Sequence, residues 1–532
     1  MKRTRREFLK TAGAASMALP LASLGCGDGG PQPAGADAAA DAAPADPGPA
    51  PIVPDDLPPY EYDGPLGPET LFQHGVASGD PTSEAVILWT RASSGAAGEV
   101  AVWWEIAVDE AFVQRVAVGT ATAGADRDHT VKVDATGLSA ATTYWYRFKA
   151  LGRTSPVGRT RTAPSGPTAH LSIAVASCAK YTSGYFAGYR RIAEKDVDVV
   201  LHLGDYIYES GVAGEVPGRN HEPPHDPVTR DEYRTRYGYY RLDPDLQEAH
   251  RRHPWIVVWD DHETANNSWK GGAEGHDEAT QGSWADRRAA GTAAYLEWLP
   301  IREQADGRIW RRFAFGDLVD LLMLDTRLWG RDEQKKEAAD LSDPTRTLLG
   351  DDQEQWLAKE LADSTATWRV LGQQVMMAPL LAAGVAFNND QWDGYPAARD
   401  RLYATIDELA IDNLVVLAGD IHSSWASELP RTTDEYDAET GAGSIAVEFV
   451  TPGITSLFPL SAGLVDLALS YNPHVKYGEV TSRGYIVLDV TASRVEATWH
   501  HFESVASADA PEVKGATFRS EHGSRRLTRI DG

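Results

Sequence analysis

From Leu171 onward, five short apolar runs each end in polar residues. They are LSIAVASC (171–178), VDVVLHLGDYIY (197–208), PWIVVWDDHE (254–263), LVDLLMLDTR (318–327) and NLVVLAGDIHSSW (413–425). Nearly continuous apolar runs of this length are typical of strands that are covered on both faces of a sheet. The pattern therefore predicts five buried strands, each followed by a polar segment.

Segments compatible with helices, such as 284–298 and 351–363, separate these runs. Strands that alternate with helices favour a largely parallel sheet and hence an α/β fold. Ligand sites in open α/β sheets lie beyond the carboxyl ends of the strands. The polar residues that we expect at this edge are Cys178, Asp205, Tyr208, Asp260, Asp261, His262, Asp325, Asp420 and His422.

Residues 66–163 have a different pattern, made of short β-branched and aromatic runs such as EAVILWTRA and TTYWYRFKALG. Turn residues separate these runs at roughly ten-residue spacing, which indicates a β-sandwich. Leu138 precedes Tyr144 by six residues, which resembles the tyrosine corner of fibronectin-type and immunoglobulin-like sandwiches. The region has no cluster of metal-binding or acid–base residues, so we interpret it as a packing or capping domain rather than a binding one.

Further strand-like stretches follow residue 444, and two of them, GYIVLDVT and RVEATWHHF, resemble a hairpin through TASR (491–494) that extends or faces the sheet. We therefore expect an α/β chain in five parts. These are a signal (1–26), a disordered linker (27–61), an all-β sandwich domain (62–165), the α/β domain (166–510) and a C-terminal tail (511–532).

The first residues predict a targeting signal. TRREFLK (4–10) contains Arg5 and Arg6, and the apolar stretch that follows is too short to span a bilayer comfortably. This matches the twin-arginine pattern, so we expect an exported protein, periplasmic, cell-surface or secreted, with the twin-arginine export machinery as a partner. Cys26 resembles a lipoprotein cleavage site with Ser23 where Leu is more usual, so acylation of Cys26 and ordinary cleavage nearby both stay open.

Composition changes this picture in two ways. The formal net charge of −27 over 532 residues repels nucleic-acid phosphates, so a phosphate substrate needs a concentrated local cation such as a metal or an arginine. Residues 27–58 are rich in Gly, Pro, Ala and Asp and predict a disordered tether. Because Cys26 is not expected to pair with Cys178, Cys178 is predicted to be a lone thiol with a role in packing or chemistry.

The polar strand ends are suited to metal ions. GDYIY (204–208) offers a carboxylate that can bridge two cations and a phenolate that needs a highly charged ion, such as ferric iron, to form near neutral pH. GDIH (419–422) places an acid and an imidazole on the same side of an extended segment. Oxygen donors favour Ca²⁺, Mg²⁺ or a ferric ion, and a thiolate and imidazole extend the choice to transition metals. The chain has no GxSxG elbow and no Walker A loop, so serine hydrolysis and nucleotide-driven work are poorly supported.

Ordered motifs across residues 66–503 resemble the alkaline phosphatase D family. The motifs are GVASGDP, ILWTR, SC, HLGDYIYE, WDDHE, DTR, GDIHSSW, VEFVTPGITS and NPHVKY. The resemblance implies an extracytoplasmic metallophosphatase joined to an N-terminal sandwich. Its second domain is similar to the calcineurin-like metallophosphoesterases, with four layers and two packed sheets. It also implies a ferric ion and calcium as cofactors, and small phosphate esters, mainly monoesters and some diesters, as substrates.

The resemblance further implies roles for individual residues. Cys178, Asp205 and Tyr208 would bind the ferric ion, with Asp205 bridging to calcium, and the other metal ligands would be Asp261, Asn266, Asp420 and His422. The register between Asn266, Asn267 and Asp260 stays open. His262 would orient phosphate or protonate the leaving group. Arg327 is expected either as a phosphate clamp or as half of an Arg–carboxylate structural pair.

These roles predict a direct reaction, in which a metal-activated water attacks phosphorus in line and no phosphoenzyme forms. One rival interpretation is a phosphodiesterase or phospholipase D-type hydrolase that uses the same metals, with the 211–250 insertion controlling access to them. The other is a non-catalytic surface protein whose sandwich binds a partner.

Overall fold

The computed structural model describes residues 55–95, 98–212, 214–335, 337–382, 384–457 and 462–531. The expected signal, Cys26 and most of the linker lie outside the described residues. Within the described part, no helix is both long enough and apolar enough to cross a bilayer.

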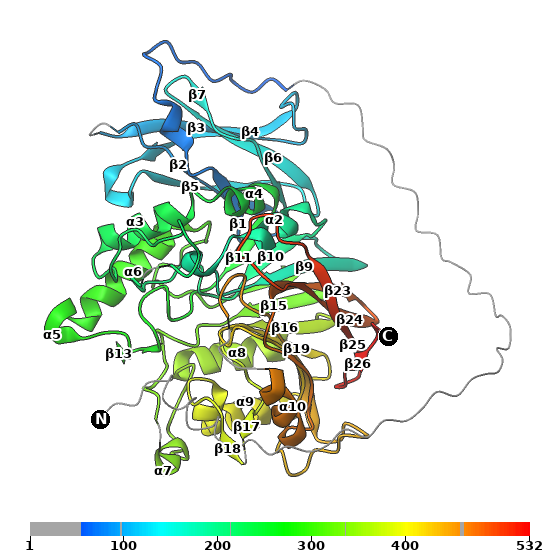
Figure 1. Ribbon diagram of the computed structural model, residues 1–532. Coiled ribbons are helices and arrows are strands. Elements are labelled where there is room, and N and C mark those ends of the chain that lie inside the picture. Colours follow the sequence, from blue (N-terminus) through cyan, green and yellow to red (C-terminus); the bar gives the residue numbers. More distant parts are fainter. Residues whose placement is uncertain are drawn as a thin grey trace, which may run out of the picture. The chain divides into compact units, whose positions relative to one another are not determined.

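The larger of the two main sheets has ten strands (Figure 1). Its order is β26 (Thr528–Arg529), β25 (Val513–Glu521), β24 (Arg494–Phe502), β23 (Arg483–Thr491), β9 (His170–Ala176), β10 (Val199–His202), β11 (Pro254–Val257), β1 (Val76–Gly79), β2 (Ala85–Arg91) and β5 (Thr130–Thr136). Strands β9, β10, β11 and β1 run parallel to one another, whereas β23 and β2 on either side of them pair antiparallel. The expected hairpin is confirmed as β23–β24, and it extends the sheet by pairing with β9.

The second main sheet has seven strands and also has a parallel centre. Its order is β14 (Arg311–Phe315), β15 (Val319–Met323), β16 (Trp368–Gly372), β19 (Leu414–Ala418), β21 (Ser444–Val450), β20 (Ser424–Pro430) and β22 (Val475–Glu479). The five predicted strands are therefore β9, β10, β11, β15 and β19, and they are divided between two sheets. The α/β class is confirmed.

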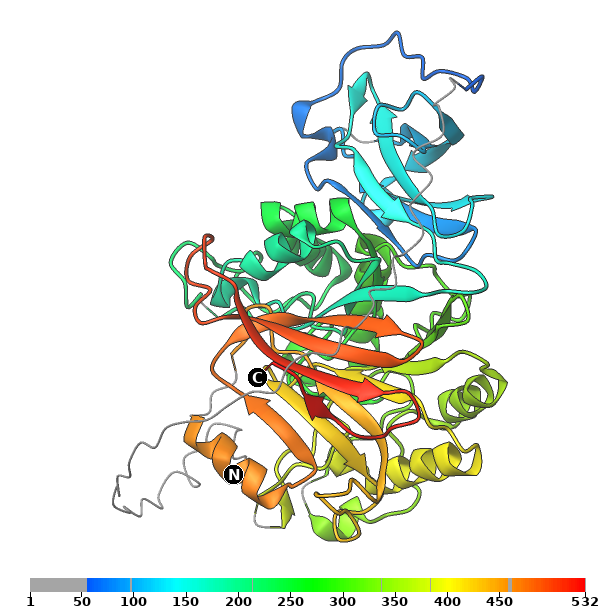
Figure 2. The same ribbon diagram turned by 90° about the vertical axis from the view of Figure 1, so that its right-hand side faces the viewer.

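The two sheets share a core, with helices on their other faces. Alternate residues of β15 and β16, such as Leu321 and Val370, cluster with Leu201 of β10. Their chain neighbours Leu322 and Leu371 cluster with helices α8 and α9 instead. These two helices are Asp351–Asp363 and Pro396–Glu408, and the helices packed around the ten-stranded sheet are α2 (Ala187–Glu194), α3 (Arg230–Tyr240), α4 (Pro244–Arg252) and α6 (Trp284–Trp298) (Figures 1 and 2).

Further helices and two short hairpins accompany these sheets. They are α5 (Glu278–Gln281), α7 (Ala338–Leu341), α10 (Ala462–Tyr471) and the hairpins β12–β13 (Ser268–Trp269 and Gly272–Ala273) and β17–β18 (Leu381–Ala382 and Val385–Ala386). Both helices expected from the sequence, 284–298 and 351–363, have those bounds in the structure. The side chain of Ser283 caps the first of them by accepting a hydrogen bond from the backbone N–H of Asp286.

The N-terminal region adds a five-stranded sheet, made of β3 (Val100–Ala107), β4 (Arg115–Ala123), β6 (Thr143–Ala150), β7 (Arg153–Thr154) and β8 (Gly158–Arg161). It packs against β2 and β5 through one hydrophobic cluster. The hydroxyl of Tyr144 accepts a hydrogen bond from the backbone N–H of Ser139 at 2.8 Å, which is the contact expected of a tyrosine corner. Because β1 pairs with β11, the region shares a continuous sheet with the second domain.

The structure differs from two expected segments, the end of the linker and the C-terminal tail. The last part of the expected linker is held against the five-stranded sheet, because Arg115 of β4 forms an ion pair with Asp55 at 2.7 Å and the ring of Tyr60 contacts Trp103 of β3. The hydrogen bond from Arg115 lowers the pKa of Asp55 to about 2. The described part of the expected tail, residues 511–531, supplies β25 and β26 of the ten-stranded sheet. In β25, Phe518 is buried and pairs with Ala497 of β24.

Candidate metal centre

The expected polar residues converge where the parallel strands end. Four of them, Cys178, Asp205, Asp420 and His422, have left-handed backbone conformations with φ between 57° and 62°. Side chains with a Cβ rarely adopt this region, and such strain clusters at functional sites. The sharp turn after each strand is what lets two separate sheets present their side chains to one place.

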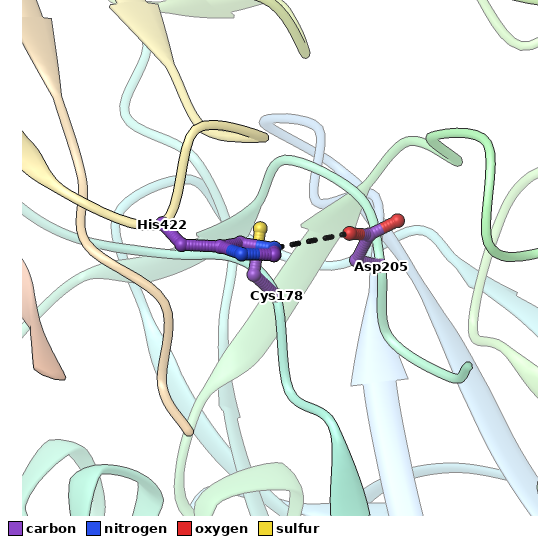
Figure 3. Close-up of side chains that lie close together, drawn as sticks. All are labelled: Cys178, Asp205 and His422. Carbon is purple, nitrogen blue, oxygen red and sulfur yellow. Dashed lines mark ion pairs between the residues drawn. The ribbon is translucent and has the colours of Figure 1, made fainter. Parts of the chain in front are cut away.

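One group contains Cys178, Asp205 and His422, whose donor atoms lie within 4.8 Å of one another (Figure 3). His422 Nε2 is 4.0 Å from Asp205 Oδ2. The hydroxyl of Tyr208 donates to Asp205 Oδ2 at 2.8 Å and lies 2.9 Å from His422 Nε2. Ser456 donates to the same hydroxyl at 2.7 Å. The set combines sulfur, nitrogen, carboxylate and phenol donors.

A second group shares Asp205 with Asp261 and His262. The backbone N–H of His262 donates to Asp205 Oδ1 at 3.3 Å, and that of Asn267 donates to Asp261 Oδ2 at 2.6 Å. Asp205 therefore lies between the two groups, with one oxygen directed to each. This is the position that a bridging carboxylate requires.

A third group, Asp260, Asp261 and Asp420, surrounds a buried arginine. The guanidinium of Arg327 is fully buried and donates to Asp260, to Asp390 at 2.8 Å and to Asp420 at 2.9 Å. Asp261 Oδ2 lies 3.8 Å from the same guanidinium. All three nitrogens of Arg327 thus contact carboxylates, which favours the structural-pair interpretation over the phosphate clamp.

The donor set fits bound cations. Burial raises the pKa of Cys178, Asp205 and Tyr208 well above the usual values, and the ionised forms are the ones that ligate metals. Asp260 Oδ2 and Asp261 Oδ1 are buried and have no hydrogen-bond partner within the described part of the chain. A bound cation would offset the cost of ionising these buried groups and would also contact the two oxygens that have no hydrogen-bond partner. Buried ionised groups need such a compensating charge.

These groups lie beside a cavity of about 450 Å³. Its lining includes Lys180, Ser183, Tyr208, Glu209, Ser210, Glu215, Asp226, His262, Asn266, His422, Ser456 and Leu457. The rings of Tyr208 and His262 stack at 4.1 Å between centroids. Asn266, expected as a metal ligand, therefore lies on the cavity wall beside His262, whereas Arg327 is not among the lining residues.

Glu209 positions His262. Its Oε2 lies 2.5 Å from His262 Nδ1, and its Oε1 accepts the backbone N–H of Asn266 at 2.8 Å. Burial lowers the pKa of His262, but nearby carboxylates, Glu209 foremost, outweigh it and hold the pKa well above the usual value. Because Nδ1 is held by Glu209, Nε2 is the nitrogen left for a substrate in the cavity.

Glu263 ties the two strand-end loops together. Its carboxylate accepts the backbone N–H groups of Asp205, Tyr206 and Asp260 at 3.0, 2.6 and 2.7 Å. Gly204 permits this approach, since a Cβ there would lie 2.3 Å from the Cβ of Asp260. The loops after β10 and β11 are therefore fixed to each other at the point where the metal-suited side chains leave the backbone.

Sequence reasoning did not assign roles to Glu209, Glu263, Asp390 or Ser456. Glu209 and Glu263 stand at the ends of motifs that the sequence displays, HLGDYIYE and WDDHE, so their positions were visible but their partners were not. Ser456 ends another motif, VEFVTPGITS. Asp390 follows no predicted strand, and no sequence pattern indicates its contact with Arg327. Asp325 lies outside the three groups and instead accepts the backbone N–H groups of Arg327 and Leu328.

We expect Glu209→Gln to lower kcat by about 10- to 100-fold without loss of bound metal, because removal of a carboxylate that orients a functional imidazole costs about that much. His262→Asn should lower kcat further, and the double variant should be no slower than His262→Asn alone. Steady-state kinetics of the three variants check this. Independent, additive losses would show that Glu209 acts other than through His262.

Two family models, a curated protein and a solved structure match this chain. The family model for PhoD-like phosphatases matches residues 173–499, and the model for the PhoD-like phosphatase N-terminal domain matches residues 65–164. The chain belongs to the PhoD-like phosphatase family. It is 37% identical over 491 residues to alkaline phosphatase D of Bacillus subtilis (strain 168), covering 86% of this chain and 82% of that protein. A solved structure of PhoD matches with a TM-score of 0.81 and 35% identity, covering 88% of this chain and 94% of the other.

Membership of the PhoD-like phosphatase family confirms the resemblance read from the motifs and identifies the chain as a phosphatase-family enzyme. The catalytic-domain match begins within β9 and ends within β24, so it includes the strand ends that carry the three groups. The candidate groups make metal binding plausible for this member.

Proposed function

We propose that the protein is an exported metal-dependent phosphatase that hydrolyses phosphate monoesters, with activity on some diesters, at a ferric and calcium centre. The observation that carries this proposal is the position of Asp205 between two donor groups that border one cavity. A thiol, a phenol and an imidazole on one side suit a ferric ion. Carboxylates on the other side suit calcium.

The residues that would hold the ions are Cys178, Asp205, Tyr208 and His422 for iron, and Asp205, Asp261, Asn266 and Asp420 for calcium. When bound, these ions would lower the pKa of a water molecule and neutralise the oxygens of a phosphoryl group. The protein itself supplies two buried loops that are locked by Glu263, so the ligands need little rearrangement on binding.

In the proposed reaction, water attacks phosphorus in line and the alcohol leaves on the opposite side. His262 gives the proton on Nε2 to the oxygen of the departing alcohol, and Glu209 keeps the ring in that orientation through Nδ1. The carboxylate also stabilises the protonated ring before transfer. No side chain becomes phosphorylated, so trapping of a stable phosphoenzyme would contradict this mechanism.

The test of this proposal is metal analysis of the native protein together with its visible spectrum and its activity on a monoester and a bis-ester. We expect iron and calcium, a charge-transfer band from thiolate or tyrosinate bound to iron, and faster hydrolysis of the monoester. Cys178→Ala and Tyr208→Phe should each lower the band, the iron content and activity more than they lower the midpoint of thermal unfolding.

Tyr189→Phe is the matched control, because Tyr189 is equally buried but its hydroxyl contacts His202 instead. It should leave the band unchanged. An iron-free, colourless and fully active protein would contradict the ferric assignment. Metal-loaded protein that hydrolyses no phosphate ester would support the non-catalytic surface protein, and preference for a phospholipid or a bis-ester would support the diesterase alternative.

A further inference from the structure

The cavity beside the metal-suited groups has an acidic rim with one exception. Glu209, Glu215 and Asp226 line it, and within the described residues Lys180 is the only lysine or arginine among the lining residues. In a chain with a formal net charge of −27, an isolated lysine at this location is a local reversal of sign. Fixed charges in a cleft bias which charged groups can enter it.

The backbone of Lys180 is held firmly. Its carbonyl accepts a hydrogen bond from Thr455 Oγ1 at 2.8 Å and another from the backbone N–H of Ser183 at 3.1 Å. The residue lies two positions after Cys178, in the same turn that leaves β9. Its backbone is therefore held near the turn that carries Cys178, while the flexible stem of the side chain allows the ammonium group to move within the cavity.

The ammonium group has a weak partner. Lys180 Nζ lies 3.7 Å from Glu215 Oε1, and the side chains are 25% and 63% exposed. Ser183 also donates to Glu215 Oε1, at 3.3 Å. Half-exposed ion pairs of this length contribute little to stability, so a better anion can displace the glutamate at low cost. The segment that carries Glu215 is fixed by its own backbone bond to Thr182 at 3.0 Å, so the glutamate stays nearby as a competitor.

We propose that Lys180 is a specificity residue that binds a second anionic group, a phosphate or a carboxylate, on the alcohol part of the substrate, and that Glu215 competes for it. This inference rests on the proposed function, because it concerns the substrate of the same site. Without Lys180, a second anionic group near the segment of Glu215 would face that carboxylate with no lysine or arginine of the cavity lining to offset it. When Lys180 is present, the second anionic group displaces Glu215 from the ammonium and gains a charge-assisted hydrogen bond. Lys180 therefore selects among phosphate esters rather than activating the phosphoryl group.

The test compares pairs of substrates that differ only in the second anion. Glycerol 3-phosphate is paired with 3-phosphoglycerate, and propane-1,3-diol monophosphate with the bisphosphate. In the metal-loaded full chain, Lys180→Met should raise KM by about tenfold for 3-phosphoglycerate and the bisphosphate, with kcat within about twofold. The KM values for the two singly anionic partners should stay unchanged, and Lys180→Arg should restore the wild-type pattern.

Glu215→Gln is the opposing variant. It removes the competitor, so KM for 3-phosphoglycerate and the bisphosphate should fall while the values for their partners do not. An equal effect of Lys180→Met on both members of each pair would overturn the proposal, because it would place the ammonium on the transferred phosphoryl group. No effect on either member would overturn it as well. If the wild-type protein hydrolyses none of the four esters, the result contradicts the proposed function, and with it the specificity role of Lys180.

Discussion

Replacement of Asp205 by Asn is expected to lower kcat/KM by about 1,000-fold and to abolish the stabilisation that bound metal gives. Asp205 is common to the first and second donor groups, and its two oxygens face different partners. A neutral amide keeps the shape but loses the charge and one of the two acceptor oxygens. Loss of ions that neutralise a phosphoryl group removes about 4 kcal/mol of transition-state stabilisation, which corresponds to this factor.

The same substitution should have little effect on the metal-free fold. Burial raises the pKa of Asp205 well above its usual value, so the metal-free fold gains little from a charged carboxylate at this position, and Asn keeps the size of the side chain and one acceptor oxygen. Thermal unfolding of both proteins, with and without added metal, separates the two effects. We expect equal midpoints without metal and a rise only in the wild type.

Asp325→Asn is the matched control for Asp205→Asn. Asp325 is also buried at a strand end, but it accepts backbone N–H groups and belongs to none of the three donor groups. We expect this variant to lose folding stability with and without metal, while it keeps the metal content of the wild type. An unchanged metal content in Asp205→Asn would contradict the bridging role.

The sequence predicts the elements of this protein well because the information is local. Apolar runs mark β9, β10, β11, β15 and β19, and the helix-compatible segments 284–298 and 351–363 match the bounds of α6 and α8. The same runs do not reveal that the strands divide between two sheets. Both sheets bury strands on two faces, and the sequence of a strand does not specify which strand it pairs with. That division was available only from the family resemblance.

The candidate site shows the same limit. Motif position predicts that Cys178, Asp205 and His422 leave the ends of strands, and the structure brings them together. The contact between Arg327 and Asp390 joins residues 63 positions apart, and Asp390 lies in a segment with no periodic pattern. Pairing at that distance depends on tertiary packing. For this reason the sequence alone allows two roles for Arg327, a phosphate clamp and a structural pair. Its buried contacts with carboxylates favour the structural pair.

Replacement of Arg327 by Met is expected to destabilise the metal-free fold by about 4 kcal/mol, measured by chemical denaturation. The guanidinium is fully buried, and its removal leaves Asp260, Asp390 and Asp420 without their shared cation. Breaking a buried ion pair by removal of one partner typically costs about 3–5 kcal/mol. Arg327→Lys should cost less, because it keeps the charge but cannot reach three carboxylates at once.

Bound metal should reduce this cost without removing it. A cation held by Asp261 and Asp420 would compensate part of the buried negative charge that Arg327 leaves unpaired, whereas the carboxylate of Asp390 would keep its contacts with Arg331 and Gln334. The difference in unfolding free energy between wild type and Arg327→Met should therefore shrink when metal is added. A phosphate clamp predicts the reverse pattern, with unchanged stability and a raised inhibition constant for inorganic phosphate. The two readouts together decide whether Arg327 acts on the substrate or holds the acidic group in place.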